Sequence, residues 1–270
     1  MKVVFTFFNL FFLAGTVLLL IFTVLSGSSK HFPLNKFYWL EADTSGIKNA
    51  PANRSAWTFW GVCDKADYSN CLLGPAYPIS PEDNFGTTAD IPKDFVDNEN
   101  TYYYLSRFAF AFCLIALAFS GLAFIIDILG FCFEIIDKVV IFLITIGLLF
   151  LAGFASLQTA VVVLAKNAFK NDGRYAHIGA KSMGIMWAAF ACLLICWLLI
   201  FAGTISNSYK KHIARVKAEQ GQYSQPTHGP AGDESSFTRA APPTKDEENT
   251  GGIRFFKIKR NQKVSDDESV

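Results

Sequence analysis

Four long stretches of the chain contain no charged residue and consist largely of apolar side chains. They cover residues 3–29, 108–126, 139–165 and 182–209. A helix needs roughly 20 apolar residues to cross the hydrocarbon of a bilayer, whereas the strands of a sheet core would be shorter and separated by turn residues. The pattern therefore predicts four membrane-spanning helices. The alternative, a soluble helical protein, would need partners that cover four fully apolar helices.

The predicted spans lie at residues 3–25, 107–126, 139–164 and 183–206. If the first span is retained, four segments lie outside the membrane. They are extracellular loop 26–106, cytosolic loop 127–138, extracellular loop 165–182 and cytosolic tail 207–270. We expect an all-α membrane bundle of four transmembrane helices, with a small β-rich, disulfide-stapled first extracellular loop and a disordered C-terminal tail.

The first stretch has a second interpretation, because Lys2 and the small-residue patch 26–28 flank it as in a cleaved signal peptide. Its apolar run is longer than a usual signal core, so we favour a retained span. Both interpretations put the tail in the cytosol. The basic cluster at 210–217 agrees with that side, whereas the basic residues of loop 165–182 disagree.

The first loop is the long polar segment between spans, and it holds two cysteines, Cys63 and Cys71. In an oxidising compartment they would form a disulfide, and closing so short a ring contributes about 2–3 kcal/mol. The alternative is a pair of free thiols in a cytosolic loop. Asn53 begins an Asn-Arg-Ser glycosylation sequon, which agrees with an extracellular loop.

Aromatic-rich segments of this loop predict short strands at Lys36–Leu40 and Ala56–Cys63, and the Gly- and Pro-rich run 74–86 predicts turns. We expect a small sheet packed on the outer membrane face. The loop also carries three tryptophans, Trp39, Trp57 and Trp60. They either belong to the sheet or lie at the level of the lipid headgroups, where indole rings are favoured.

The four uncharged stretches hold few polar side chains and no acid or base, which argues against proton-coupled transport. Gln158 is able to hydrogen-bond across helices, a contact that contributes about 1 kcal/mol in membranes. Small residues recur at every fourth position in two rows, Ala152–Ser156–Ala160 and Gly184–Ala188–Cys192–Cys196. Such rows allow close helix contact, so we expect them to hold the bundle together, with contact between neighbouring molecules as the alternative.

The tail is poor in aliphatic residues and rich in Gly, Pro, Ser, Lys and Glu, which predicts disorder after a helical continuation to about Ala218. One basic cluster is interleaved with Phe and Ile: Arg254, Lys257, Lys259, Arg260 and Lys263. Anionic lipid of the inner leaflet would attract it, unless it is simply a solvated charge run.

Two modifications follow from local sequence. Ser265 precedes an Asp-Asp-Glu run, which is typical of an acidophilic kinase site, and phosphate there would weaken lipid attachment of the tail. Cys132 lies in the expected inner loop close to the membrane, so palmitoylation is a second hypothesis, with an unmodified thiol as the alternative.

Composition supports a membrane protein without catalytic chemistry. Of the 270 residues 51% are hydrophobic and 17% charged, against about a quarter charged in soluble domains. A net charge of +1 argues against nucleic-acid binding. The sequence contains none of the common phosphate-binding, metal-ligand or nucleophile motifs, so we expect no catalytic residues, no metal and no cofactor.

The first loop resembles a known family. Trp60-Gly61-Val62-Cys63 followed by Cys71 is similar to the W-x-x-C…C signature of claudin-like four-span proteins, and Arg107 matches the Arg often found at the mouth of their second span. Phe59 departs from the Leu usual in claudins. The whole layout over residues 1–217 resembles the fungal Sur-seven/PalI family.

The resemblance implies a function that the composition does not show. Sur-seven proteins of fungi occupy static plasma-membrane domains with eisosomes and affect membrane organisation, endocytosis and cell-wall integrity, whereas the PalI branch assists ambient-pH signalling. We therefore expect a non-enzymatic plasma-membrane scaffold, with a PalI-like membrane helper as the alternative. Its expected partners are membrane lipids, further copies or related four-span proteins, and cytosolic eisosome coat proteins.

Overall fold

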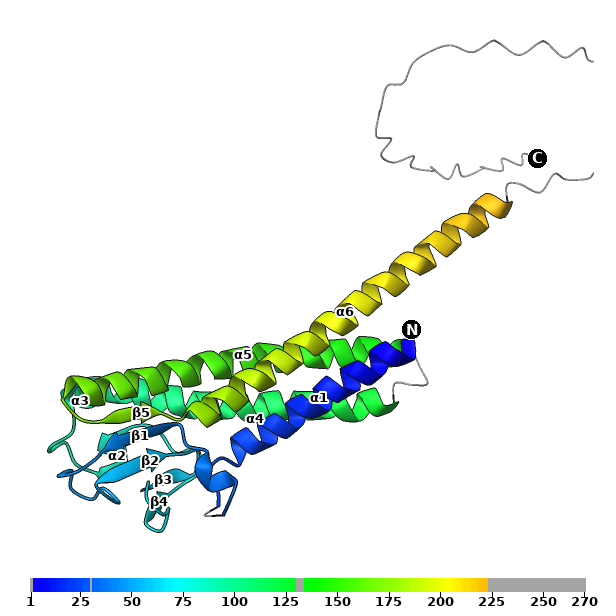
Figure 1. Ribbon diagram of the computed structural model, residues 1–270. Coiled ribbons are helices and arrows are strands. Elements are labelled where there is room, and N and C mark those ends of the chain that lie inside the picture. The colour runs from blue at the N-terminus through cyan, green and yellow to red at the C-terminus, as the bar shows by residue number, and fades with distance from the viewer. Residues whose placement is uncertain (1, 30, 130–133, 223–270) are drawn as a thin grey trace, which may run out of the picture. The chain divides into compact units, whose positions relative to one another are not determined.

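The computed structural model describes residues 2–29, 31–129 and 134–222, with four long helices and a small antiparallel sheet (Figure 1). The long helices are α1 (Lys2–Val24), α4 (Glu99–Leu129), α5 (Glu134–Asn171) and α6 (Ala180–Gln222). All four are long and apolar enough to cross a membrane, where a helix satisfies its own backbone hydrogen bonds. The prediction of four spanning helices is confirmed.

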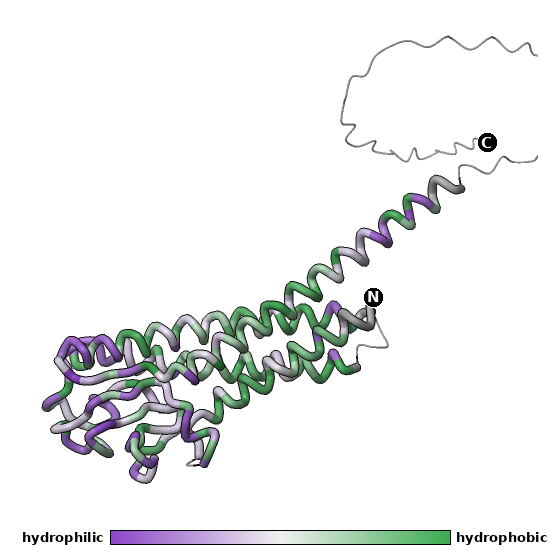
Figure 2. The backbone as a smooth tube through the Cα atoms, viewed as in Figure 1, coloured by the Kyte–Doolittle hydropathy of each residue, from purple (hydrophilic) through white to green (hydrophobic). Residues whose placement is uncertain are grey.

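The helices form a bundle in which α1 packs against α4 and α6, and α5 packs against α4 and α6. α4 begins at Glu99 and α5 continues to Asn171, so both helices extend beyond the uncharged stretches. Their polar ends lie along the sheet (Figure 2). The later turns of α6 become hydrophilic and run on past the bundle (Figure 2).

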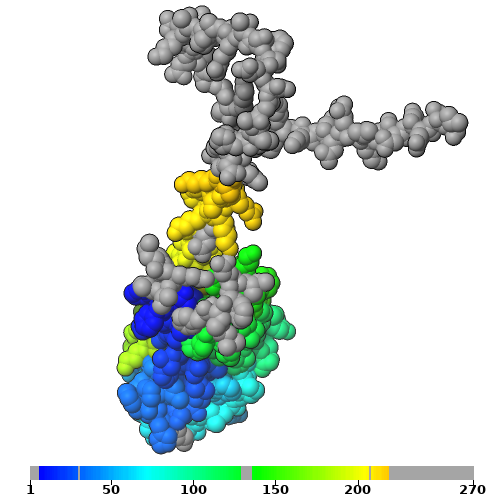
Figure 3. Space-filling view, turned by 90° about the vertical axis from the view of Figure 1, so that its right-hand side faces the viewer, coloured from blue at the N-terminus to red at the C-terminus, as the bar shows by residue number. Residues whose placement is uncertain are grey.

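The sheet contains five strands in the order β4-β3-β2-β1-β5, all antiparallel. Their bounds are β1 Leu40–Asp43, β2 Arg54–Trp57, β3 Gly61–Asp64, β4 Cys71–Leu73 and β5 Ala176–Ile178. β5 comes from the segment between α5 and α6 and pairs with β1, with Leu40 opposite Ile178. Both loops at this end of the bundle therefore form one unit, the sheet domain (residues 31–98 and 172–179), which lies toward the side where α1 packs (Figures 1 and 3).

Two predicted strands are wrong in their bounds. Within Lys36–Leu40 the chain leaves the short 3-10 helix η1 (Leu34–Lys36), and β1 starts only at Leu40. Ala56–Cys63 is not one strand but parts of β2 and β3, because the chain turns between them. The Thr58 hydroxyl stabilises this turn by donating to the Gly61 carbonyl, 3.0 Å away, and accepting from the Trp60 amide at 3.2 Å.

The Gly- and Pro-rich run holds a short helix, α2 (Pro81–Phe85), where we expected only turns. Proline in the first helical turn needs no amide hydrogen, and Gly86 ends the helix in the left-handed region with φ of 62°. A second short helix, α3 (Lys93–Asp97), precedes α4 and buries Phe95.

An aromatic core joins the sheet to the helices. Trp39 and Trp57 are fully buried, so the alternative that places them among lipid headgroups is wrong. The Trp39 ring lies 6.2 Å from that of Phe154, and the Trp57 ring 5.8 Å from that of Phe169, both on α5. Phe59 completes the contact, with its ring 5.1 Å from that of Phe110 on α4.

Polar side chains cross-link the helices at the end away from the sheet. Asn9 of α1 donates to a carboxylate oxygen of Asp127 on α4 at 2.9 Å, and the Trp197 indole of α6 donates to the Thr145 hydroxyl of α5 at 3.0 Å. Gln158 is buried, but its amide oxygen has no hydrogen-bond donor among the described residues. We expected the Gln158 side chain to hydrogen-bond across helices, and its amide oxygen makes no such bond within the described part of the chain.

The small-residue rows do not lie where we expected them. Ser156 and Ala160 of α5 and Gly184 and Ala188 of α6 are exposed on the bundle surface, and only Cys196 at the end of the second row is buried. The expectation that these rows hold the bundle together is therefore wrong for the four exposed members.

Gly179 tests how closely the sheet packs on the start of α6. A Cβ atom at this position would lie 1.7 Å from the Tyr38 carbonyl oxygen, whereas one at Gly184 would meet open space. We expect Gly179→Ala to lower the melting temperature of the purified protein by at least about 5 °C, because the backbone at Tyr38, just before β1, would have to move. Gly184→Ala is the matched control and should leave it unchanged or raise it slightly; equal melting temperatures for both variants would contradict this packing.

Candidate functional site

The two cysteines of the first loop face each other across the β3–β4 hairpin. Cys63 and Cys71 are paired in register, with Cα atoms 4.0 Å apart, and form a disulfide. The bond closes the 64–70 turn and packs beside Tyr68 and Ala56 in a small buried cluster. The expected disulfide is confirmed.

The remaining motif residues attach this hairpin to the bundle. The Trp60 indole donates a 2.7 Å hydrogen bond to the Val24 carbonyl at the end of α1, and its ring meets that of Phe110 edge-on at 5.9 Å. A Cβ atom at Gly61 would lie 2.3 Å from the Leu72 carbonyl oxygen. Glycine is therefore required for β3 and β4 to approach, and the tryptophan fixes the hairpin to the helix ends.

Arg107 lies apart from the disulfide, on the exposed surface of α4. Its guanidinium carbon is 4.5 Å from the centre of the Tyr103 ring, one turn earlier on the same helix. This cation–π contact holds the side chain in place without neutralising it. The structure thus brings Trp60, Gly61, Cys63 and Cys71 together in one hairpin and leaves Arg107 with different neighbours.

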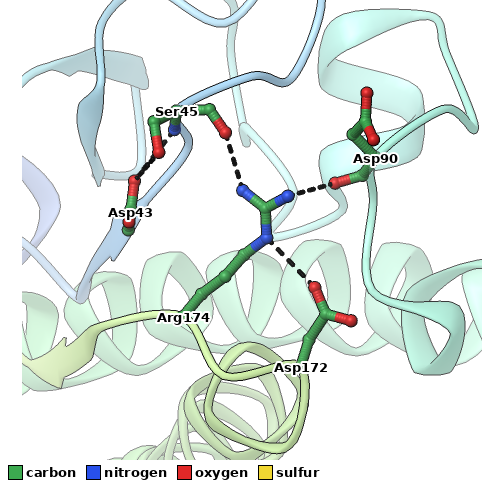
Figure 4. A network of polar contacts seen from close by, with 5 residues as sticks. All are labelled: Asp43, Ser45, Asp90, Asp172 and Arg174. Carbon is green, nitrogen blue, oxygen red and sulfur yellow. Dashed lines mark hydrogen bonds and ion pairs between the residues drawn. The ribbon is translucent and has the colours of Figure 1, made fainter.

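A single arginine joins three segments of the sheet domain (Figure 4). Arg174, which precedes β5, donates to the Ser45 carbonyl at 2.8 Å and to the Asp90 carbonyl at 2.9 Å, and pairs with the Asp172 carboxylate at 3.0 Å. Side-chain and backbone hydrogen bonds from Ser45 hold the pKa of Asp43 below its usual value, and the positive charge of Arg174 adds to this effect. We call this group the arginine clamp.

The clamp was not predicted from the sequence, where Arg174 counted only as a charge in a loop. The available signal was Gly173, two residues past the end of α5, which has a φ of 74° and marks the turn that directs Arg174 toward the first loop. A related contact lies on the neighbouring strands, where the Arg54 guanidinium is 4.3 Å from the centre of the Tyr175 ring and 3.5 Å from the Glu41 carboxylate.

The other predicted sites are exposed or lie outside the described residues. Asn53 is exposed just before β2, and nothing in the structure tests its glycosylation. Cys132, the tail cluster Arg254–Lys263 and Ser265 lie outside the described residues. Within residues 2–29, 31–129 and 134–222, no group of three or more His, Cys, Asp or Glu side chains is arranged to bind a metal ion.

The arginine clamp can be tested by a conservative substitution. Arg174→Lys keeps the charge, but an ammonium cannot reach three acceptors in the geometry of the guanidinium fork. We expect amide hydrogen exchange in residues 44–50 and 87–92 to accelerate about tenfold in this variant. Lys170→Gln, an exposed change near the end of α5, is the control; unchanged exchange in Arg174→Lys would show that the clamp does not order these loops.

Comparison with known proteins agrees with this geometry. The model of the SUR7/PalI family matches residues 5–199. Protein SUR7 of Saccharomyces cerevisiae is 36% identical over 97% of this chain and 96% of its own length. The SUR7 family protein FMP45 of the same yeast is 35% identical over 74% of this chain and 68% of its own length.

A further plasma membrane protein of Saccharomyces cerevisiae is 32% identical over 95% of this chain and 88% of its own length. The family match covers most of the chain, including the whole sheet domain, all of α4 and α5, and parts of α1 and α6. The protein therefore belongs to the SUR7/PalI family.

Proposed function

We propose that this protein is a non-enzymatic scaffold that assembles laterally in a domain of the fungal plasma membrane. The relatives support the location, since one of them is named a plasma membrane protein and all three compared come from a yeast. The observation that carries the proposal is the exposure of small residues on α5 and on α6, because these positions are not used for packing within the bundle.

The sheet domain faces the outside of the cell in this proposal. A disulfide persists in an oxidising compartment, and Cys63–Cys71 lies in that domain. At the opposite end of the bundle, α6 carries exposed basic residues at 210–217, as expected on the cytosolic side. Both termini then lie in the cytosol, and Asn53 is accessible for glycosylation.

Lateral contact forms at four exposed positions, Ser156 and Ala160 of α5 and Gly184 and Ala188 of α6, which we call the small-residue face. Association of helices within lipid depends on close packing, because the lipid is as apolar as the side chains. Small side chains permit this close approach, and large ones prevent it. The face therefore suits a second copy or a related four-span protein.

The cytosolic parts provide the remaining contacts of the scaffold. The basic end of α6 and the cluster Arg254–Lys263 attract anionic lipid of the inner leaflet, and the tail contacts the eisosome coat. Through this assembly the protein affects endocytosis and cell-wall organisation. The SUR7 names of two compared relatives favour this branch over a PalI-like role in ambient-pH signalling.

The small-residue face can be tested by enlarging it. The double variant Ser156→Leu/Ala160→Leu should reduce cross-linking between differently tagged copies about tenfold, because the added side chains separate the two helices. In the fungal plasma membrane the variant should change from static patches to a diffuse distribution. Its melting temperature should stay within about 2 °C of the original, since both positions are exposed.

Leu18→Phe serves as the matched control, since Leu18 is exposed and belongs to α1, which carries no member of the small-residue face. This variant should cross-link and cluster like the unaltered protein. Static patches and full cross-linking in the Ser156→Leu/Ala160→Leu variant would refute assembly through this face. Diffuse localisation of the unaltered protein would refute the scaffold itself.

A further inference from the structure

A cavity of about 550 Å³ lies between the chain segment that follows β4, helix α2 and the start of α4. Its polar and aromatic lining consists of Tyr77, Asp83, Asn84, Tyr103 and Arg107. These residues come from three separate segments, so the folded sheet domain and α4 create the site together. The disulfide hairpin and the arginine clamp do not contribute to this lining.

The cation of the cavity is held in position but has no ion pair. One face of the Arg107 guanidinium rests on the Tyr103 ring, and among the described residues the ion pairs of arginine involve Arg54 and Arg174 only. The edge of the guanidinium thus keeps N–H donors for a ligand. Its fork matches the geometry of a phosphate, which accepts two parallel hydrogen bonds.

The other polar groups favour a headgroup with donors over a bare anion. Asp83, although hydrogen-bonded to the Ser80 hydroxyl at 2.6 Å, adds a negative charge to the cavity, which disfavours a simple anion. Asn84 accepts the Trp57 indole hydrogen at 2.7 Å through its side-chain oxygen, so its NH₂ group remains a donor. Burial raises the pKa of Tyr77 to about 12, so its hydroxyl stays neutral.

The position of the cavity along α4 favours a lipid as its ligand. Arg107 directly precedes Phe108, the first residue of the uncharged stretch of α4, and Phe108 is exposed on the helix surface. Tyr104, one turn earlier, is exposed as well. The guanidinium is therefore placed at the boundary between water and hydrocarbon, where phosphates of lipid headgroups lie, with apolar surface beside it for acyl chains.

We propose that this cavity binds the phosphodiester headgroup of a membrane lipid in the leaflet next to the sheet domain, with the phosphate on Arg107 and a hydroxyl or ammonium group of the headgroup at Asp83. This inference rests on the proposed membrane placement of α4, but not on lateral assembly. The balance of one cation, one anion and neutral donors suits a phosphodiester that carries a polar substituent.

The test uses the full chain purified in a neutral detergent and titrated with phosphatidylinositol, with bound lipid measured by native mass spectrometry. We expect Arg107→Gln to weaken binding at least tenfold and Arg107→Lys to weaken it less, because the ammonium keeps the charge but loses the fork. Lys93→Gln removes the same charge at an exposed position in α3, outside the cavity, and should bind like the unaltered protein. Diacylglycerol, which lacks phosphate, should not bind.

Three outcomes would overturn the proposal. The first is equal binding of phosphatidylinositol by the unaltered protein and by Arg107→Gln, and the second is binding of diacylglycerol as tight as that of phosphatidylinositol. The third is displacement of the lipid by inorganic phosphate at equal concentration, which would indicate a site for free anions. If Arg107→Gln fails to fold, Arg107→Lys decides by the same criterion. The Ser156→Leu/Ala160→Leu variant should bind lipid normally, so that failure of this site and failure of the scaffold are separate results.

Discussion

Aromatic contact between the sheet and the ends of α4 and α5 is the interaction on which the rest of the sheet domain depends. Trp39, Trp57 and Phe59 enter the bundle from the sheet and meet Phe110, Phe154 and Phe169. Burying one such ring contributes about 2–3 kcal/mol, whereas a hydrogen bond contributes about 1 kcal/mol. The rings therefore outweigh the polar links around them in fixing the sheet against the helices.

Because this aromatic core fixes the sheet, the disulfide and the arginine clamp have only local roles. The disulfide closes only the edge hairpin β3–β4, and the arginine clamp orders the loops at the opposite edge of the sheet. Neither lies between the sheet and the helices, so each adjusts the surface of a domain that the rings already hold. The cavity beside Arg107 and the small-residue face are the surfaces that we propose for contact with lipid and with neighbouring proteins.

The sequence allowed prediction of those features that depend on local pattern. Four uncharged stretches indicated the helices, and two isolated cysteines indicated the disulfide. The pairing of β1 with β5 could not be predicted, because Leu40 and Ile178 lie far apart in sequence and β5 is too short to show a periodic pattern. The hairpin inside Ala56–Cys63 was missed because its turn is stabilised by the Thr58 side chain and not by a usual turn pair.

The candidate site was predictable in part for the same reason. Trp60, Gly61, Cys63 and Cys71 form a local motif, and the structure brings them together in one hairpin. Arg174 was considered only as a loop charge, which the charge rule assigns to the cytosolic side, whereas in the fold its guanidinium donates to the carbonyls of Ser45 and Asp90. The exposure of the small-residue face depends on the packing of whole helices, which spacing along one helix does not reveal.

The placement of the sheet domain outside the cell is tested most directly by labelling intact cells with a membrane-impermeant reductant and a bulky impermeant maleimide. With the sheet domain outside the cell, Cys71, the less buried cysteine of the pair, is labelled after this reduction, whereas a cysteine introduced by Ser224→Cys is labelled only once the membrane is permeabilised. Labelling of the Ser224→Cys position in intact cells, with Cys71 protected, would contradict this placement.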